Sequence, residues 1–145
     1  MENKTEDINE EQSVETVETG YKPRAPQKEI HKAIKENRWV TAICHRRMGK
    51  TVCAINQLIH SALNCTKESP QLAYIAPTYS QAKRIAWDYL KEYTRPLGGV
   101  ANVSELRVDF LGRRISLYGA DNPDALRGIY LDGAVIDEYG DVHPS

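Results

Sequence analysis

The sequence predicts an α/β fold with a mostly parallel β-sheet and helices on both faces. Apolar segments of strand length alternate with segments whose apolar residues recur at helical spacing, as crossover connections between parallel strands require. The chain has 145 residues, 41% hydrophobic and 27% charged, which suits one ordinary globular domain. No apolar run approaches the roughly 18 residues of a membrane span.

Three segments have the periodicity of amphipathic helices. The first has a proline in its first turn, the second starts within a Gly-Lys-Thr sequence, and the third follows a Pro-Thr turn. The apolar positions are Ile30, Ala33 and Ile34 in the first, Val52, Ile55, Leu58, Ile59, Ala62 and Leu63 in the second, and Ala82, Ile85, Ala86 and Tyr89 in the third. We therefore expect helices near 26–34, 50–63 and 80–93.

Short apolar runs predict the strands between these helices. Residues 39–43, 72–76 and 134–136 are apolar and have strand length, and a hairpin is expected from 107–110 to 115–118 across a turn at 111–114. No internal repeat is visible. The order of the elements predicts a sheet in which strands and helices alternate.

Charge divides the chain into two parts. Residues 1–20 carry seven acidic side chains against one lysine, a net charge of −6, whereas residues 21–145 carry 18 basic and 13 acidic groups, a net of +5. With no aromatic and three large apolar residues, the first twenty cannot bury enough surface to offset chain entropy. We expect a disordered acidic tail over 1–20 and a folded, mildly basic domain over 21–145, compatible with a nucleic-acid partner.

The N-terminal sequence and the cysteines limit the compartment. The start MENKTEDINEE is too polar for a signal peptide, so we expect a cytosolic protein that is not secreted. Cys44, Cys53 and Cys65 show no CxxC spacing, which favours neither a disulfide framework nor a zinc site. They are expected to be small buried residues.

A phosphate-binding loop is indicated at residues 44–51, CHRRMGKT. The pattern GxxxxGK(S/T) matches at Gly49, Lys50 and Thr51 but has Cys44 in place of the first glycine. Gly49 lets backbone amides approach phosphate, Lys50 supplies a cation, and the Thr51 hydroxyl can ligate Mg²⁺. The first glycine only eases the turn, so a small residue can replace it. The alternative interpretation is a cationic helix start without a ligand.

Two acids follow the last apolar strand and resemble a Walker B segment. Asp137 would hold the hydration shell of Mg²⁺, and Glu138 would polarise the water that attacks the γ-phosphate. Both carboxylates are expected at the carboxyl end of a strand, where open parallel sheets bind ligands. An Asp-Glu pair that only caps a strand end remains the alternative. Together the two motifs indicate a P-loop NTPase of the ASCE, RecA-like type.

These residues carry a family resemblance. CHRRMGKT, then AYIAPTYSQA, then ISLYGADNPDALRGIYLDGAVIDEYGD resemble the N-terminal part of the ATPase domain of the large terminase subunit of tailed bacteriophages. The resemblance covers about residues 21–145, and GADNPDALRG before the acidic strand is its most specific part. It implies an ATPase that uses ATP and Mg²⁺ to drive DNA packaging.

The resemblance also implies roles for single residues. An arginine inside the loop senses the γ-phosphate in that family, which implies Arg46, with Arg47 as its rival and a solvated basic turn as the alternative. Gln27 would read the adenine edge, and Arg127 would be an arginine finger offered to the neighbouring subunit's ATP. Residues 76–78 with Gln81 would couple the site to DNA. The expected nucleotide-binding set is Gln27, Cys44, His45, Arg46, Arg47, Met48, Gly49, Lys50 and Thr51; the catalytic set is Glu138, Arg46 and Arg127; and the metal ligands are Thr51 and Asp137.

The implied partners are those of a packaging motor: double-stranded DNA, portal protein, the small terminase subunit and further copies of the chain in a ring on the procapsid, in the host cytoplasm and without a membrane. A large terminase continues beyond the acidic strand to a nuclease domain, and this sequence stops at Ser145. We therefore expect a fragment or truncated gene product of the motor, truncated after the Walker B strand, without nuclease residues.

Two other functions stay open. A superfamily 2 helicase-like ATPase shares the phosphate loop and Asp-Glu, although Tyr139 and Gly140 follow here in place of the usual Ala and Asp or His. A truncated remnant that binds nucleotide or a partner without turnover is the non-enzymatic alternative.

Overall fold

The computed structural model describes residues 20–44 and 48–138. The predicted acidic tail, apart from Gly20, lies outside the described residues, so the boundary near residue 20 stays a prediction. The elements are α2 (Ala25–Glu36), α3 (Lys50–Asn64), β1 (Gln71–Ala76), α4 (Tyr79–Thr94), the 3₁₀ helix η1 (Arg95–Leu97), β2 (Val100–Asn102), β3 (Arg107–Phe110), β4 (Arg113–Gly119), α5 (Pro123–Leu126) and β5 (Gly133–Ile136).

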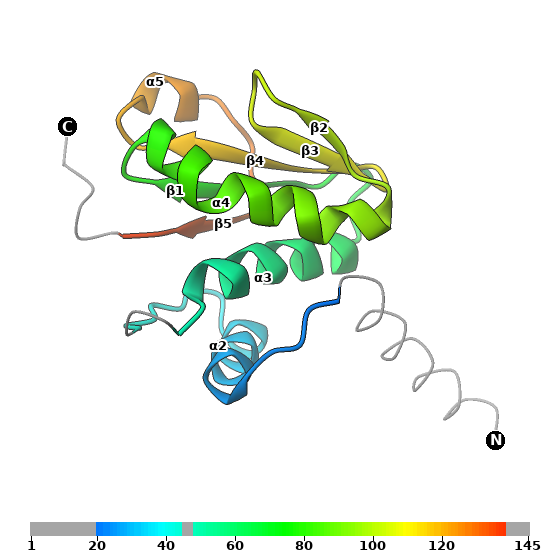
Figure 1. Ribbon diagram of the computed structural model, residues 1–145, viewed down its shortest axis with the longest axis vertical. Coiled ribbons are helices and arrows are strands. Elements are labelled where there is room, and N and C mark those ends of the chain that lie inside the picture. The colour runs from blue at the N-terminus through cyan, green and yellow to red at the C-terminus, as the bar shows by residue number, and fades with distance from the viewer. Residues whose placement is uncertain (1–19, 45–47, 139–145) are drawn as a thin grey trace.

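The sheet has five strands in the order β2-β3-β4-β1-β5. In Figure 1 the strands follow one another from β2 to β5, and α4 runs across them. β1 pairs in parallel with both β4 and β5, whereas β2, β3 and β4 are joined by antiparallel pairing. The sheet is thus mixed, with its parallel part at β4, β1 and β5.

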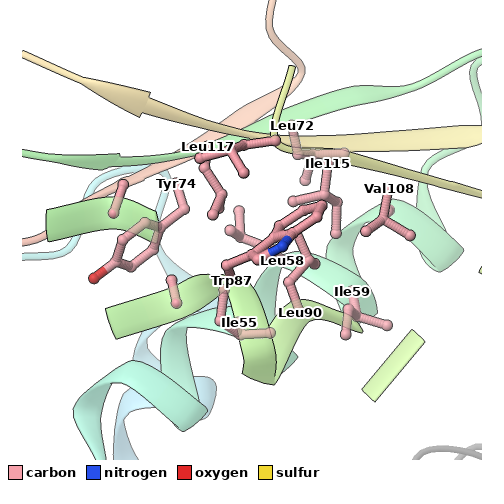
Figure 2. Close-up of a cluster of buried hydrophobic side chains, with 14 of the residues drawn as sticks. Ile55, Leu58, Ile59, Leu72, Tyr74, Trp87, Leu90, Val108, Ile115 and Leu117 are labelled. Carbon is pink, nitrogen blue, oxygen red and sulfur yellow. The ribbon is translucent and has the colours of Figure 1, made fainter. Parts of the chain in front are cut away.

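The core lies between the sheet and two long helices. Helices α3 and α4 contact each other and share β1 and β4, so they cover the same face. Figure 2 shows the buried side chains between the strands and these helices. They include Ile55, Leu58 and Ile59 from α3, Trp87 and Leu90 from α4, and Leu72, Tyr74, Val108, Ile115 and Leu117 from the sheet. Helix α2 lies beyond α3, away from the sheet.

Local sequence explains where the helices begin. Helix α2 has Pro26 in its first turn, where a missing N–H costs nothing. Helix α4 is capped by Thr78, whose hydroxyl accepts a hydrogen bond from the Gln81 amide at 3.1 Å. Gly49 caps α3 in the left-handed region, with φ 78°. Within the described residues, no helix has the length and hydropathy needed to cross a bilayer.

Most predicted elements are confirmed. The three helices and the strands near 72–76 and 134–136 are present, and the hairpin is present with a shorter turn. Leu111 and Gly112 both have positive φ, which matches a two-residue turn, so β4 starts at Arg113. The three cysteines are free; Cys53 is buried, and the other two are half-buried.

The strand predicted at 39–43 is absent. Trp39 is 83% and Ile43 99% exposed, and the segment has no regular secondary structure. An apolar run becomes a strand only where a neighbouring strand offers its backbone groups. Both edges of β1 are paired, by β4 and β5, and the open outer edge of β5 does not pair with 39–43.

The prediction of helices on both faces also needs correction. Beside α3 and α4, the described helices are α2, which packs on α3, and the short α5 and η1. At β5, Val135 packs against the core, while Ala134 and Ile136 on the other face are exposed, Ile136 to 50%. Along the described residues, that face of β5 therefore carries no helix.

Helix α4 turns a different face to the core than its periodicity predicted. Ala82 and Ala86 are buried as expected, but Ile85 is half-buried and Tyr89 is 38% exposed. The core takes Trp87 and Leu90 instead. Two small alanines let the helix approach the sheet closely, and the larger side chains on their flank fill the remaining space.

The turns after β1 and β4 are tied together. The Ala120 amide donates to Ala76 O at 2.8 Å, the Asp121 amide donates to Pro77 O at 3.1 Å, and Asp121 Oδ1 accepts from the Tyr79 amide at 3.1 Å. A Cβ on Gly119 would lie 2.1 Å from Tyr79 N. This close approach explains the glycine that opens the GADNPDALRG segment.

We predict that Gly119→Ala destabilises the fold by about 3 kcal/mol, because the added methyl group would meet backbone atoms, Tyr79 N at 2.1 Å and Thr78 C at 2.7 Å, which cannot move aside as the nearby Asp121 side chain can. Gly133→Ala is the matched control, because its Cβ would meet only Leu72 Cδ2 at 3.1 Å and that side chain can shift. Urea unfolding of both variants measures the difference. Equal, small losses would mean that the two turns are less closely packed.

Candidate functional site

The two predicted motifs meet at one point of the structure. Lys50 Nζ forms an ion pair with Glu138 and lies 3.8 Å from Asp137 Oδ1, although 88 residues of sequence separate Lys50 from Glu138. Pairing of β5 with β1 makes this possible, since it brings the acids that follow β5 to the N-terminus of α3. A cation at a helix start and two carboxylates at a strand end thus share one site.

The described end of the phosphate loop has the geometry that its sequence predicts. Gly49 is left-handed, and Lys50 is the first residue of α3, so the loop leads directly into a helix N-terminus. The free amides and the helix dipole favour an anion at this position. Thr51 follows in the first turn and is half-buried. The described residues therefore place a lysine, a threonine and a helix N-terminus together at the end of the predicted loop.

Asp137 is held from several sides. Its Oδ2 accepts a hydrogen bond from the Tyr74 hydroxyl, its Oδ1 accepts from the Glu138 amide at 2.9 Å, and its own amide donates to Ile75 O at 2.9 Å. The side chain is 13% exposed. These contacts fix the carboxylate in one orientation beside Lys50.

Tyr74 connects the two motifs from the centre of the sheet. Its ring belongs to the core, and Figure 2 shows its oxygen pointing away from the aliphatic cluster. Burial raises the pKa of Tyr74, the hydrogen bond to Asp137 raises it further, and a hydrogen bond to Thr51 acts in the opposite direction. The hydroxyl thus lies between a loop side chain and an acid.

Glu138 has an unusual backbone conformation for a residue with a side chain. Its φ is 52°, in the left-handed region, which costs about 1–2 kcal/mol for a residue other than glycine. Strain of this kind is concentrated at functional sites, where the surrounding structure enforces it. The conformation supports a functional role for this glutamate.

The charge state of Lys50 follows from its partners. The hydrogen bond to Glu138 is the main cause that raises the pKa of Lys50. Burial acts in the opposite direction, and the charge of Asp137 raises the pKa to a lesser extent. The lysine is therefore a permanent cation near neutral pH. With side chains 38% and 44% exposed, the Lys50–Glu138 pair contributes little net stability.

A groove of about 650 Å³ adjoins this cluster. Gly49, Lys50, Thr51 and Val52 line one wall, α4 lines the other, and Glu138 lies between them. Helix α4 contributes Arg84, Ile85, Asp88 and Tyr89. The volume is in the range of small-molecule sites, and the polar groups converge at the loop.

Gln27 is placed beside the loop but already uses its amide. Its Nε2 donates to Gly49 O at 3.1 Å and to Met48 O at 3.5 Å, and its Oε1 accepts from the Arg24 amide at 2.9 Å. The residue is 4% exposed. In this structure the side chain contacts the loop backbone, and reading adenine stays a prediction.

Arg127 lies apart from the groove lining. It directly follows α5, its side chain is 81% exposed, and it pairs with Asp124 at 3.4 Å. Asp132, the next acid along the chain, accepts from Lys67 and from the Gln71 amide instead. The arginine therefore has no buried structural contact among the described residues, and a role toward a second subunit stays a prediction.

Three predicted loop residues, His45, Arg46 and Arg47, lie outside the described residues. Cys44 is half-buried with a free thiol, and Met48 contributes its carbonyl oxygen as an acceptor. The roles assigned to these five positions stay predictions.

The oxygen donors near Lys50 fit a magnesium ion that is shared with phosphate. Thr51 supplies a hydroxyl and Asp137 an oriented carboxylate, both hard ligands of the kind Mg²⁺ prefers. Among the described residues no group of three His, Cys, Asp or Glu side chains forms a metal cage. Mg²⁺ suits such a sparse donor set, because it keeps several waters and binds with substrate phosphates.

The sequence interpretation missed Tyr74, Arg24 and Arg84. Tyr74 could have been noticed as the one polar group in an otherwise apolar strand expected next to the acids. Arg24 donates through Nη2 to Met48 O, a contact between segments 24 residues apart that sequence spacing does not reveal. Arg84 lines the groove because α4 is rotated from its predicted orientation.

Comparison with solved structures shows the fold of phage large terminases. The large terminase ATPase domain of Thermus phage P74-26 matches with a TM-score of 0.68 and 23% identity, over 88% of this chain and 58% of that chain. A mutant of the same domain gives the same values. The large terminase from the thermophilic bacteriophage D6E matches with a TM-score of 0.55 and 20% identity, over 68% of this chain and 26% of that chain.

At these identities the likeness establishes the fold. The resemblance to large terminase ATPase domains predicted from the sequence is thus confirmed at that level. The chain spans little more than half of the length of the P74-26 domain, 58%. No protein-family model and no curated protein matches the chain.

We predict that Tyr74→Phe lowers the free energy of unfolding by about 2 kcal/mol, because Asp137 loses a hydrogen bond to a charged acceptor. Tyr118→Phe is the control, since Tyr118 is a half-buried tyrosine of the neighbouring strand β4. It should cost less than about 0.5 kcal/mol. Urea denaturation provides both values, and equal effects would show that the Tyr74 hydroxyl does not hold Asp137.

Proposed function

We propose that this chain is the nucleotide-binding part of an ATPase motor of the large terminase type, which drives DNA into a procapsid. The observation that carries the proposal is the meeting of Lys50 with Asp137 and Glu138 at the start of α3. The likeness to the P74-26 ATPase domain supports the same assignment.

In this proposal the groups of the loop bind the triphosphate. The amides at the start of α3 face phosphate oxygens, and Lys50 lies between the β- and γ-phosphates. Thr51 and Asp137 hold Mg²⁺. When bound there, the ion would supply positive charge beside the phosphate oxygens.

Lys50 cannot serve phosphate and Glu138 equally well. Without nucleotide it pairs with Glu138, whose carboxylate is then occupied. Phosphate oxygens compete for the same ammonium group and release the glutamate. We therefore infer that nucleotide binding frees the base that hydrolysis needs.

Glu138 then acts as general base. It accepts a proton from the water that attacks the γ-phosphorus, the bond to the β–γ bridging oxygen breaks, and ADP and phosphate leave. Arg46, or Arg47 as its rival, stabilises charge on the γ-phosphate in this scheme. His45, Cys44 and Met48 complete the loop around the phosphates. Adenine reading by Gln27, which the family resemblance implies, competes with the contacts of its amide to Met48 O and Gly49 O.

Arg127 is proposed as the finger that acts on a neighbouring subunit. Its exposed position after α5 and its solvent-exposed partner Asp124 leave it available to a second copy. The proposed partners are double-stranded DNA, portal protein, a small terminase subunit and further copies of the chain in a ring. The proposed location is the host cytoplasm. Residues 76–78 and Gln81 are the proposed link between the site and DNA.

A second candidate is nucleotide binding without turnover. The exposed Trp39 and Ile43 before the loop and the exposed Ile136 on β5 favour it, because they leave apolar surface beside the site uncovered among the described residues. Binding and hydrolysis must therefore be measured separately.

We expect Lys50→Ala to weaken binding of Mg²⁺·ATP roughly 10–100-fold, because a charged hydrogen bond to phosphate is worth about 1.5–3 kcal/mol. Isothermal titration calorimetry measures the affinity. Lys83→Ala, on the exposed surface of α4, removes the same charge and should change nothing. If Lys50→Ala binds like the wild type, the loop is not a phosphate site.

Mixing variants tests hydrolysis and the role of Arg127. Glu138→Gln should keep nucleotide binding but lose about 10²–10⁴-fold in turnover, and Arg127→Ala should lose turnover only in the assembled motor.

Rings mixed from the two variants should regain activity, because the intact arginines of Glu138→Gln subunits serve the intact sites of Arg127→Ala subunits. No recovery in verified mixed rings would exclude action between subunits, and wild-type binding without turnover would favour the second candidate.

A further inference from the structure

The first turn of α2 contacts the end of the phosphate loop. Arg24 donates through Nη2 to Met48 O, and Gln27 donates through Nε2 to Gly49 O at 3.1 Å. Gln27 Oε1 accepts from the Arg24 amide at 2.9 Å, which joins the two side chains into one unit. We call Arg24 and Gln27 together the α2 brace.

The contact is close as well as polar. A Cβ on Gly49 would lie 2.7 Å from Gln27 Nε2 and 2.9 Å from Arg24 Nη2. Gln27 is 4% exposed, so its donors have no ready replacement from bulk water. Gly49 is therefore required by its positive φ and also by the two side chains packed against it.

Peptide geometry links the contacts on the Met48 and Gly49 carbonyls to the orientation of the Gly49 and Lys50 amides. The described chain has no cis peptide bond, and in a trans peptide the carbonyl and the following N–H point in opposite directions. Carbonyls of Met48 and Gly49 that face α2 therefore turn the amides of Gly49 and Lys50 away from α2. Gly49 O also accepts from the Cys53 amide at 2.9 Å, which fixes it along the axis of α3.

We propose that Arg24 and Gln27 are positioning residues that hold the Gly49 and Lys50 amides in the orientation that receives phosphate. The ligand class is the polyphosphate part of a nucleotide, and this inference rests on the proposed function. Because the Gln27 amide nitrogen contacts Gly49 O at 3.1 Å and lies 3.5 Å from Met48 O, we place its contribution in phosphate affinity rather than in selection of the base.

The α2 brace is separate from the contacts that dock α2 on α3. His31 Nδ1 lies 2.6 Å from Gln57 Oε1, and the Tyr21 hydroxyl lies 2.8 Å from His31 Nε2. Gln57 also donates to Ser61 at 2.9 Å. These contacts keep α2 in place when Arg24 is replaced, so a variant at Arg24 is expected to fold.

The decisive experiment compares two ligands by isothermal titration calorimetry: Mg²⁺·ATP and Mg²⁺·tripolyphosphate, which has no base. Arg24→Ala and Gln27→Met should each weaken both ligands by the same factor, about tenfold. Arg24→Lys keeps a donor and the charge and should recover part of the loss. Lys28→Ala, an exposed neighbour on α2, removes one charge without touching the loop and should have no effect.

Hydrogen exchange gives a second measurement that needs no ligand. In the wild type the Gly49 and Lys50 amides have one orientation, so Arg24→Ala should change their exchange rates several-fold while the melting temperature stays within a few degrees. A variant that lowers the melting temperature strongly acts on the fold, and that result would overturn a specific positioning role.

The outcomes separate the two proposals. Wild-type protein that binds neither ligand would overturn the proposed function, while the exchange rates would still decide on the brace. If the wild type binds both and Gln27→Met loses only ATP affinity, Gln27 reads the base and the positioning role is wrong. Unchanged affinities and exchange rates in Arg24→Ala would also overturn it.

Discussion

Parallel pairing of β5 with β1 is the constraint on which the candidate site depends. It places Val135 opposite Tyr74 and Ile136 opposite Ile75, so the chain leaves the sheet with Asp137 beside the start of α3. The Asp137 amide still donates to Ile75 O, which extends the ladder by one bond. Lys50 meets the acids only because α3 packs on the same strands. The hydrophobic core thus sets the distance between groups of opposite charge.

Charge and packing have different roles at this site. The Lys50–Glu138 pair is too exposed to stabilise the fold much, whereas Tyr74 is fully buried at its ring and polar at its tip. Tyr74 therefore transfers the rigidity of the core to Asp137. Glu138, next to Asp137, is held in a strained backbone conformation. Our proposal that bound nucleotide releases Glu138 from Lys50 requires these two features: a lysine contact that can exchange and a carboxylate, Asp137, that stays fixed.

Periodicity predicted the helices and most strands, because the side chains that a helix or strand buries recur at a spacing fixed by its geometry. It failed at 39–43, an apolar run that is exposed and pairs with no described strand. It also failed for Ile85 and Tyr89. Ala82 and Ala86 can share a buried helix face either with Ile85 and Tyr89 or with Trp87 and Leu90, and spacing alone does not decide between these two faces. Motifs predicted Lys50, Thr51, Asp137 and Glu138 as site residues, and the structure brings these four side chains to one place. Tyr74 and Arg24 were missed because their roles depend on contacts across the fold.

The central claim is that Lys50 exchanges Glu138 for phosphate. A crystal structure of the chain with Mg²⁺ and a non-hydrolysable ATP analogue tests it most directly. Our account predicts Lys50 Nζ within hydrogen-bond distance of the β- and γ-phosphate oxygens, Mg²⁺ beside Thr51 and Asp137, and a Glu138 carboxylate released from the lysine. A triphosphate bound elsewhere, or Lys50 still paired with Glu138 beside a bound triphosphate, would contradict it.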